Sequence, residues 1–177
     1  MDLTEAGQLY GALAGCEAVV HMGAWANPGV VPDTRTYADN TTGTFNLLQA
    51  AADLGIRRVV SASSNQVYLF FEAPPLYAPV DQEHSCRPVN CYALSKTAGE
   101  QAAEYFSRHK GLDIFSLRIL GTRTPDEIPG DVAKIVAYPA SAAKLLWTRS
   151  DARDAAVACR LAIAPNCATV CRVSSRH

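Results

Sequence analysis

A tyrosine and a lysine four residues apart are the side chains of this sequence best suited to proton transfer. Tyr92 and Lys96 lie in a segment, residues 92–109, with the pattern of a helix, and an i,i+4 spacing places both side chains on one helical face. A nearby cation favours the phenolate, so we expect Lys96 to lower the pKa of Tyr92 below its usual value of about 10. Such a phenol can take a proton from a sugar or alcohol hydroxyl while a hydride leaves the adjacent carbon. A packed tyrosine beside a solvated lysine is the alternative for an isolated pair.

The elements that must position this pair alternate between short apolar strands and longer helical segments. We expect strands at residues 17–22, 57–62 and 113–119, and helices at residues 5–14, 40–53 and 92–109. This alternation implies right-handed crossovers and a parallel sheet covered on both faces. Ligands of such sheets bind beyond the carboxyl ends of the strands, where residues 21–24 and 61–64 are expected, the latter ending in the pair Ser63 and Ser64. The chemically useful residues are therefore expected to converge.

The remaining segments are less regular. Residues 69–90 hold four of the ten prolines and show no helical period, so we predict an ordered loop that walls a substrate cleft, with a plain surface excursion as the alternative. Residues 121–130 have the composition of a linker, and residues 131–149 are ambiguous. We predict a helix at residues 151–164 and a last short strand at residues 168–173.

Composition excludes several classes of protein. A net charge of −1 over 177 residues gives no electrostatic case for binding nucleic acid or an anionic membrane surface, and no apolar run is long enough to span a bilayer. The N-terminal residues lack the pattern of a signal peptide, so we expect a cytoplasmic protein. The six cysteines show no paired spacing and the four histidines are dispersed, so no metal site is expected.

Several segments, in order along the chain, resemble the extended short-chain dehydrogenase/reductase family, which includes the NAD-dependent sugar epimerases and dehydratases. The matching segments are residues 2–4 (Asp-Leu-Thr), residues 18–24, residues 40–48, residues 59–68 (Val-Val-Ser-Ala-Ser-Ser-Asn-Gln-Val-Tyr), the Tyr92–Lys96 pair, residues 117–118 (Leu-Arg) and residues 147–164. The resemblance spans nearly the whole chain, and this ordered context favours the catalytic interpretation of the pair over the structural one.

The resemblance implies a role for each matching position. Tyr92 would be the acid/base, Lys96 would lower its pKa and hold the nicotinamide ribose, and Ser64 would bind the reacting oxygen. The residues expected near NAD or NADP, besides Tyr92 and Lys96, are Asp2, Leu3, Met22, Gly23, Ala24 and Asn40. For Asn40 we favour a tie between the start of its helix and the neighbouring strand over a direct cofactor contact.

The resemblance also implies an incomplete α/β fold. We expect a partial Rossmann-like parallel sheet with helices on both faces, lacking the first βαβ unit, in residues 1–125, and a fragment of a small substrate subdomain in residues 126–177. The glycine-rich turn that takes the pyrophosphate in this family has no counterpart here, because the spacing of Gly7, Gly11 and Gly15 is wrong for it. We therefore expect weak or absent cofactor binding by this 177-residue chain, which micromolar NAD binding in calorimetry would contradict.

Three functional interpretations remain open. The first is an NAD(P)-dependent epimerase or dehydratase acting on a sugar or nucleotide-sugar, and the second is a uronate-type sugar-acid dehydrogenase, which the residues 63–65 (Ser-Ser-Asn) also resemble. The third is a truncated, non-catalytic remnant or dimerising fragment. Leu69 stands where the family usually has glycine, and Gly121 stands where it often has asparagine. These two differences leave the identity of the substrate open. The family also implies a homodimer through helices 40–53 and 92–109.

Overall fold

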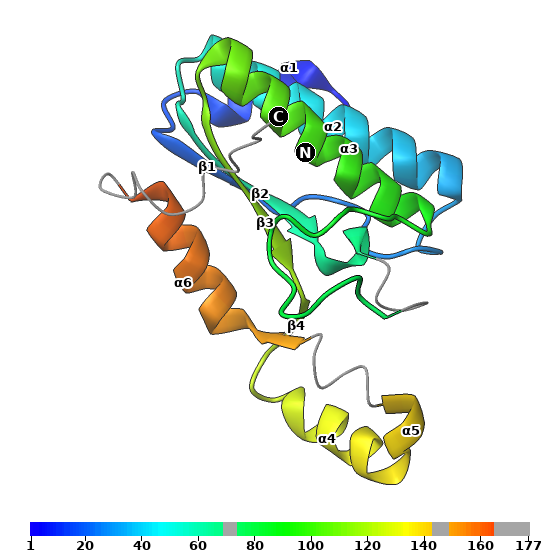
Figure 1. Cartoon of the computed structure of the whole chain (residues 1–177). Helices are drawn as coiled ribbons and strands as arrows, with labels where there is room; N and C mark the ends of the chain where they lie inside the picture. Colours follow the sequence, from blue (N-terminus) through cyan, green and yellow to red (C-terminus); the bar gives the residue numbers. More distant parts are fainter. Residues whose placement is uncertain (69–73, 143–148, 165–177) are drawn as a thin grey trace.

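A three-stranded parallel sheet lies at the centre of the molecule (Figure 1). The computed structural model describes residues 1–68, 74–142 and 149–164. The strands β1 (Ala18–His21), β2 (Arg58–Ser64) and β3 (Asp113–Ile119) lie in the order β1-β2-β3, so the strand before the catalytic serine candidate is central. In the parallel register Val19 pairs with Val59, and Val60 pairs with Phe115. This confirms the predicted α/β class and Rossmann-like parallel sheet.

Three helices cover one face of this sheet. They are α1 (Ala6–Leu13), α2 (Asp33–Asp53) and α3 (Cys91–Lys110), of which α2 and α3 run side by side (Figure 1). The core between them and the sheet includes Leu9, Leu48, Val59 and Phe106, all fully buried. These contacts fix α3, and with it Tyr92, against the sheet.

The ends of α3 follow from its flanking residues. The Asn90 side chain accepts a hydrogen bond of 2.8 Å from the backbone N–H of Ala93, which caps the N-terminus. Gly111 ends the helix at φ +70°, a conformation that costs glycine little. The helix therefore begins one residue before Tyr92, which places this tyrosine in the first turn.

Helix α6 (Ala152–Ile163) covers the opposite face of the sheet (Figure 1). Val60 points to this face, opposite to its neighbour Val59, and packs with Cys159 and Ala162. The Asp151 side chain caps the helix by accepting a hydrogen bond of 2.8 Å from the backbone N–H of Arg153. The predicted helix at residues 151–164 and the covering of both sheet faces are thus confirmed.

Residues 121–130 are not the linker that their composition indicates. They contain β4 (Gly121–Arg123), which pairs in parallel with β5 (Arg149–Asp151), and the start of α4 (Ile128–Ala137), which the short α5 (Pro139–Ala142) follows. The prolines were misleading because Pro129 lies in the first turn of α4, where its missing N–H costs no hydrogen bond. The predicted strand at residues 168–173 lies outside the described residues.

Helix α2 begins earlier than predicted, and the predicted loop has no regular secondary structure in its described part. Helix α2 begins at Asp33, seven residues before the predicted start at Asn40. Residues 74–90, the described part of the predicted loop, form no helix or strand. None of the helices in the described ranges is long and apolar enough to cross a membrane.

Candidate active site

The three residues predicted to be catalytic come together where β2 ends and α3 begins. Ser64 is the last residue of β2 and Tyr92 lies in the first turn of α3; both are buried, and the Ser64 hydroxyl lies close enough to the phenol to influence its pKa. Lys96, one turn further along α3, donates a hydrogen bond of 2.7 Å from Nζ to the backbone carbonyl of Ala62 on β2. Its Nζ lies 5.7 Å from the centre of the Tyr92 ring. The geometry is that of a phenol with a hydroxyl partner and a nearby ammonium.

The electrostatics of this group differ from the prediction. Burial raises the pKa of Tyr92, and the hydrogen bond with Ser64 only partly opposes this, so the prediction that Lys96 lowers the pKa is wrong for this structure. Lys96 is itself desolvated, which lowers its pKa to about 8, and its ammonium donates to the Ala62 carbonyl. The site as described therefore holds a neutral phenol, ready to donate its proton.

A buried histidine stands next to this group. His21, the last residue of β1, is 5% exposed, and its Nε2 lies 3.2 Å from Oγ1 of Thr44 on α2. Burial, with a smaller contribution from the charge on Lys96, lowers the pKa of His21 to about 4. The imidazole is therefore neutral near pH 7 and adds no second cation beside Lys96.

The buried histidine predicts a loss of stability in mild acid. Its pKa falls from 6.5 to about 4 on folding, so between these pH values the unfolded chain binds the proton and the folded chain does not. The free energy of unfolding should therefore fall by about 3 kcal/mol as the pH drops from 6.5 to 4. Urea titrations across this range should show a flatter dependence for His21→Gln, which keeps a polar partner for Thr44.

The matched control for this experiment is His109→Gln, at an exposed position of α3. This variant should keep the pH dependence of the wild type. Parallel curves for the wild type and His21→Gln would show that the buried imidazole does not cause the acid sensitivity.

The predicted cofactor residues at the end of β1 form a rim. Met22 and Gly23 are exposed and Ala24 is half-buried, so this stretch is open to a ligand. Leu3 packs so closely that a Cβ on Gly23 or on Gly43 would lie 2.6 or 2.8 Å from its side chain. The half-buried Leu3 side chain therefore joins the N-terminal turn to the rim and to α2.

The acidic turn beside this rim is internally hydrogen-bonded. Asp2 Oδ1 accepts hydrogen bonds of 2.9 Å from the backbone N–H of Thr4 and 2.8 Å from its hydroxyl, which lower the pKa of this exposed carboxyl. Asn46 of α2 donates to the carbonyls of Leu3 and Thr4 at 3.3 and 3.0 Å. A contact between Asp2 and an adenine stays a prediction, and Asn46, which holds the turn, was not found from the sequence.

Asn40 joins three segments of the protein. Its Oδ1 accepts a hydrogen bond of 2.8 Å from the backbone N–H of Trp25, and its Nδ2 donates to the Trp25 carbonyl at 3.2 Å and to Ser95 Oγ at 3.0 Å. Because α2 begins at Asp33, Asn40 ties the interior of the helix, rather than its start, to the loop after β1 and to α3. Both amide hydrogens are used inside the protein, so we assign no cofactor contact to Asn40.

One buried donor in the site was not found from the sequence. Asn65 follows Ser64 directly and is 7% exposed, and its Nδ2 has no hydrogen-bond partner among the described residues. A buried amide without a partner costs free energy, which a ligand oxygen would recover. Only the Ser-Ser-Asn sequence after a predicted strand pointed to this position. Within the described ranges no group of three or more histidine, cysteine or acidic side chains could hold a metal ion.

Comparison with known proteins places this site in a family. The sequence model of the NAD dependent epimerase/dehydratase family matches residues 1–155, which include every residue of the candidate site. The chain belongs to the NAD-dependent epimerase/dehydratase family. The resemblance noted in the sequence is thereby confirmed.

The family members that resemble this chain act on different sugars. It is 31% identical over 137 residues to L-arabinose 1-dehydrogenase (NAD(P)(+)) of Haloferax volcanii, covering 72% of this chain and 54% of that protein. It is 30% identical over 125 residues to uronate dehydrogenase of Pseudomonas syringae pv. tomato, covering 71% of this chain and 43% of that protein.

A solved structure is also similar to this chain. A double mutant of the dTDP-glucose 4,6-dehydratase of Streptomyces venezuelae, crystallised with NAD, superposes with a TM-score of 0.64 at 30% identity and covers 77% of this chain and 44% of that one. The chain spans about half the length of the curated relatives it matches.

Proposed function

We propose that this family member contributes the acid–base half of a nicotinamide-dependent oxidation at a sugar carbon, in an epimerase or dehydratase type of reaction. The proposal depends mainly on one observation, the convergence of the Ser64 hydroxyl, the Tyr92 phenol and the Lys96 ammonium at the end of β2. In the phenolate form Tyr92 takes the proton of the reacting hydroxyl, and the Ser64 hydroxyl holds the same oxygen. In the reverse direction the neutral phenol returns the proton.

The residues present fit a nicotinamide cofactor, NAD or NADP. An ammonium has three N–H donors, and one of those of Lys96 has a hydrogen-bond partner among the described residues, which leaves donors for the hydroxyls of a ribose. The open rim at Met22 and Gly23, with Asp2 in the adjoining turn, offers room for the rest of the cofactor. Nicotinamide, when bound, would supply the hydride acceptor. A Lys96 ammonium that binds the ribose would also favour the phenolate form of Tyr92.

A uronate-type dehydrogenase is the second candidate. The unpartnered Nδ2 of Asn65 supports it, because an amide N–H beside Ser64 can bind a carboxylate or hydroxyl oxygen of a sugar acid. The similarity to the uronate dehydrogenase of Pseudomonas syringae gives it further support. The two candidates differ in the fate of the hydride, which an epimerase or dehydratase returns to its substrate within one turnover.

The absorbance of reduced nicotinamide distinguishes these candidates. The protein is incubated with saturating NAD or NADP and, separately, with a hexuronate, an aldopentose and a UDP-hexose. Interconversion of the sugar without net reduction would establish the epimerase or dehydratase, whereas net reduction with the hexuronate would establish the dehydrogenase. If no probe reacts and no cofactor binds, the chain is the non-catalytic remnant or dimerising fragment, and the proposed function is wrong.

We also propose that the protein forms a cytoplasmic homodimer through α2 and α3. Phe45 on α2 and Tyr105 on α3 are about half exposed, and both rings lie 5.3 Å from the ring of the buried Phe106, so they form one aromatic patch across the two helices. Such a patch fits a second copy of the same face, which would bury it. The described cysteines at positions 16, 86, 91 and 159 are free, in keeping with a reducing compartment.

The variant Phe45→Glu is expected to convert the dimer to a monomer, because a carboxylate at the centre of the patch would be buried without a partner. Static light scattering at high protein concentration measures the change in mass. Val136→Glu, at a 73% exposed position on α4, is the matched control and should keep the dimer. A wild-type protein that is monomeric at high concentration would contradict the proposed interface.

A further inference from the structure

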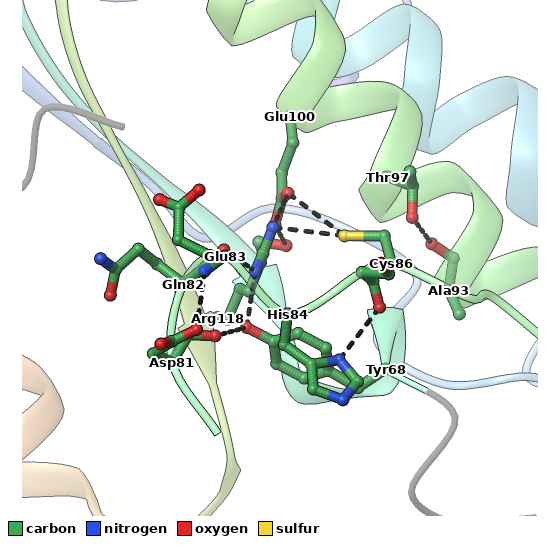
Figure 2. Close-up of polar contacts among 12 residues, drawn as sticks. Tyr68, Asp81, Gln82, Glu83, His84, Cys86, Ala93, Thr97, Glu100 and Arg118 are labelled. Atoms are coloured by element: carbon green, nitrogen blue, oxygen red, sulfur yellow. Dashed lines mark hydrogen bonds and ion pairs between the residues drawn. The ribbon is translucent and has the colours of Figure 1, made fainter. Parts of the chain in front are cut away.

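The guanidinium of Arg118, near the end of β3, has all five of its N–H groups engaged (Figure 2). Nε and Nη2 donate to the two carboxylate oxygens of Glu100 at 2.9 and 2.8 Å. Nη1 donates to the Tyr68 hydroxyl at 2.5 Å and to the Gln82 carbonyl at 3.0 Å, and Nη2 also reaches Cys86 Sγ at 3.2 Å. The side chains of Arg118 and Glu100 are 22% and 16% exposed, so little solvent screens the pair.

The partners of Arg118 belong to the segments that flank the catalytic candidates. Tyr68 follows the short 3-10 helix η1 (Asn65–Val67) that begins directly after Ser64, whereas Gln82 and Cys86 lie on the stretch that leads to Tyr92. These segments also contact each other, because the Tyr68 hydroxyl donates to the Asp81 carbonyl at 3.2 Å.

Glu100 extends the network to the catalytic strand and helix. It lies one turn after Lys96 on α3, and its Oε1 accepts a hydrogen bond of 2.5 Å from the hydroxyl of Ser63, the neighbour of Ser64. In the sheet, Ser63 is the register partner of Arg118. A single cation therefore joins β2, β3, α3 and the chain segments after Ser64 and before Tyr92.

We propose that Arg118 is a positioning residue, which sets the placement of Ser64 relative to Tyr92 by binding the segments that flank both. The effect of Arg118 on catalysis rests on the proposed function. Its role in keeping residues 81–86 in place does not depend on that function. A lysine would keep the charge but has three N–H groups and no planar fork, so it cannot replace the five contacts.

The test compares Arg118→Lys with Arg108→Lys. Arg108 also pairs with a glutamate, Glu104, but both side chains are about half exposed, so its replacement is a matched control. Hydrogen exchange should accelerate about tenfold or more at the backbone N–H groups of His84 and Arg87, which donate to Asp81 and Val67, while the N–H groups of β2 stay within about twofold. Unchanged exchange at His84 and Arg87 would overturn the proposal.

A second variant covers the case in which Arg118→Lys unfolds. Tyr68→Phe keeps the ring, which packs against His84 at 5.3 Å, and removes only the hydroxyl between Arg118 and Asp81. Faster exchange confined to residues 81–87 is the expected result. Exchange that rises equally throughout the protein, or nowhere, would mean that Arg118 has no specific hold on this segment.

A kinetic measurement tests the link to catalysis. With the probe sugar that reacts, Arg118→Lys should lower kcat about 10- to 100-fold and leave KM within about threefold, because misplaced acid–base groups affect the transition state more than binding. A change in KM alone would refute the positioning role. If the wild type turns over no sugar, that result counts against the proposed function, and the exchange experiment alone decides whether Arg118 holds the segment.

Discussion

Replacing Tyr92 by phenylalanine is expected to reduce turnover about 100- to 10,000-fold, the usual contribution of a positioned acid or base. The ring of Tyr92 is buried at the start of α3, and phenylalanine keeps its packing while removing only the hydroxyl that faces Ser64. The loss should appear in kcat and kcat/KM alike, since proton transfer belongs to the transition state. Steady-state kinetics with the sugar that reacts, together with a thermal unfolding curve, measure both activity and fold.

The matched control is Tyr105→Phe on the same helix. Tyr105 is 47% exposed and remote from the end of β2, so removing its hydroxyl should leave turnover within about twofold of the wild type. If Tyr92→Phe kept full activity in a folded protein, the phenol would not be the acid–base group, and the proposed mechanism would fail.

Leu48→Ala is expected to cost about 2 to 5 kcal/mol of unfolding free energy, the range for truncating a fully buried leucine. Leu48 lies on α2 with none of its surface exposed, in the core that holds α2 and α3 against the sheet. Because this core cannot close fully around the missing atoms, the loss combines reduced burial with a residual cavity. Urea unfolding followed by circular dichroism measures the difference in free energy.

Leu94→Ala is the control for this prediction, because it makes the same substitution in a helix at a side chain that is 47% exposed. It should cost less than about 1 kcal/mol. Similar losses for the two variants would show that the buried face of α2 does not determine stability.

Local patterns were sufficient to predict most of the elements that carry the site. The β-branched run at residues 57–62 and the helix over residues 92–109 were found close to their true bounds, because strand propensity and the stop at Gly111 act locally. The start of α2 was missed because residues 33–39 are largely polar and lack an apolar period. The pairing of β4 with β5 was missed because it joins residues far apart in the chain.

The convergence of Ser64, Tyr92 and Lys96 was predicted from the sequence, but the electrostatics of the group was not. The spacing of Tyr92 and Lys96, with the serine pair before them, was enough to predict that Ser64, Tyr92 and Lys96 lie close together. The pKa of Tyr92 was predicted in the wrong direction because burial, which depends on the packed structure, raises it. The same limit applies to the unpartnered Asn65 amide and to the five contacts of Arg118, which exist only once distant segments meet.

The pairing of β4 with β5 has a consequence for how this protein can diverge. The excursion from the sheet leaves through β4 and returns through β5, which runs directly into α6, so its two ends lie side by side. Because the two ends are adjacent, the length of the excursion has little effect on the free energy of closing it. The entropic cost of closure rises by only about 0.6 kcal/mol for each doubling of length. We therefore expect changes in length between β4 and β5 to leave the return of α6 to the sheet, and the Ser64–Tyr92 geometry, intact. We expect this excursion to vary in length more freely than the sheet that carries Ser64 and the helix that carries Tyr92.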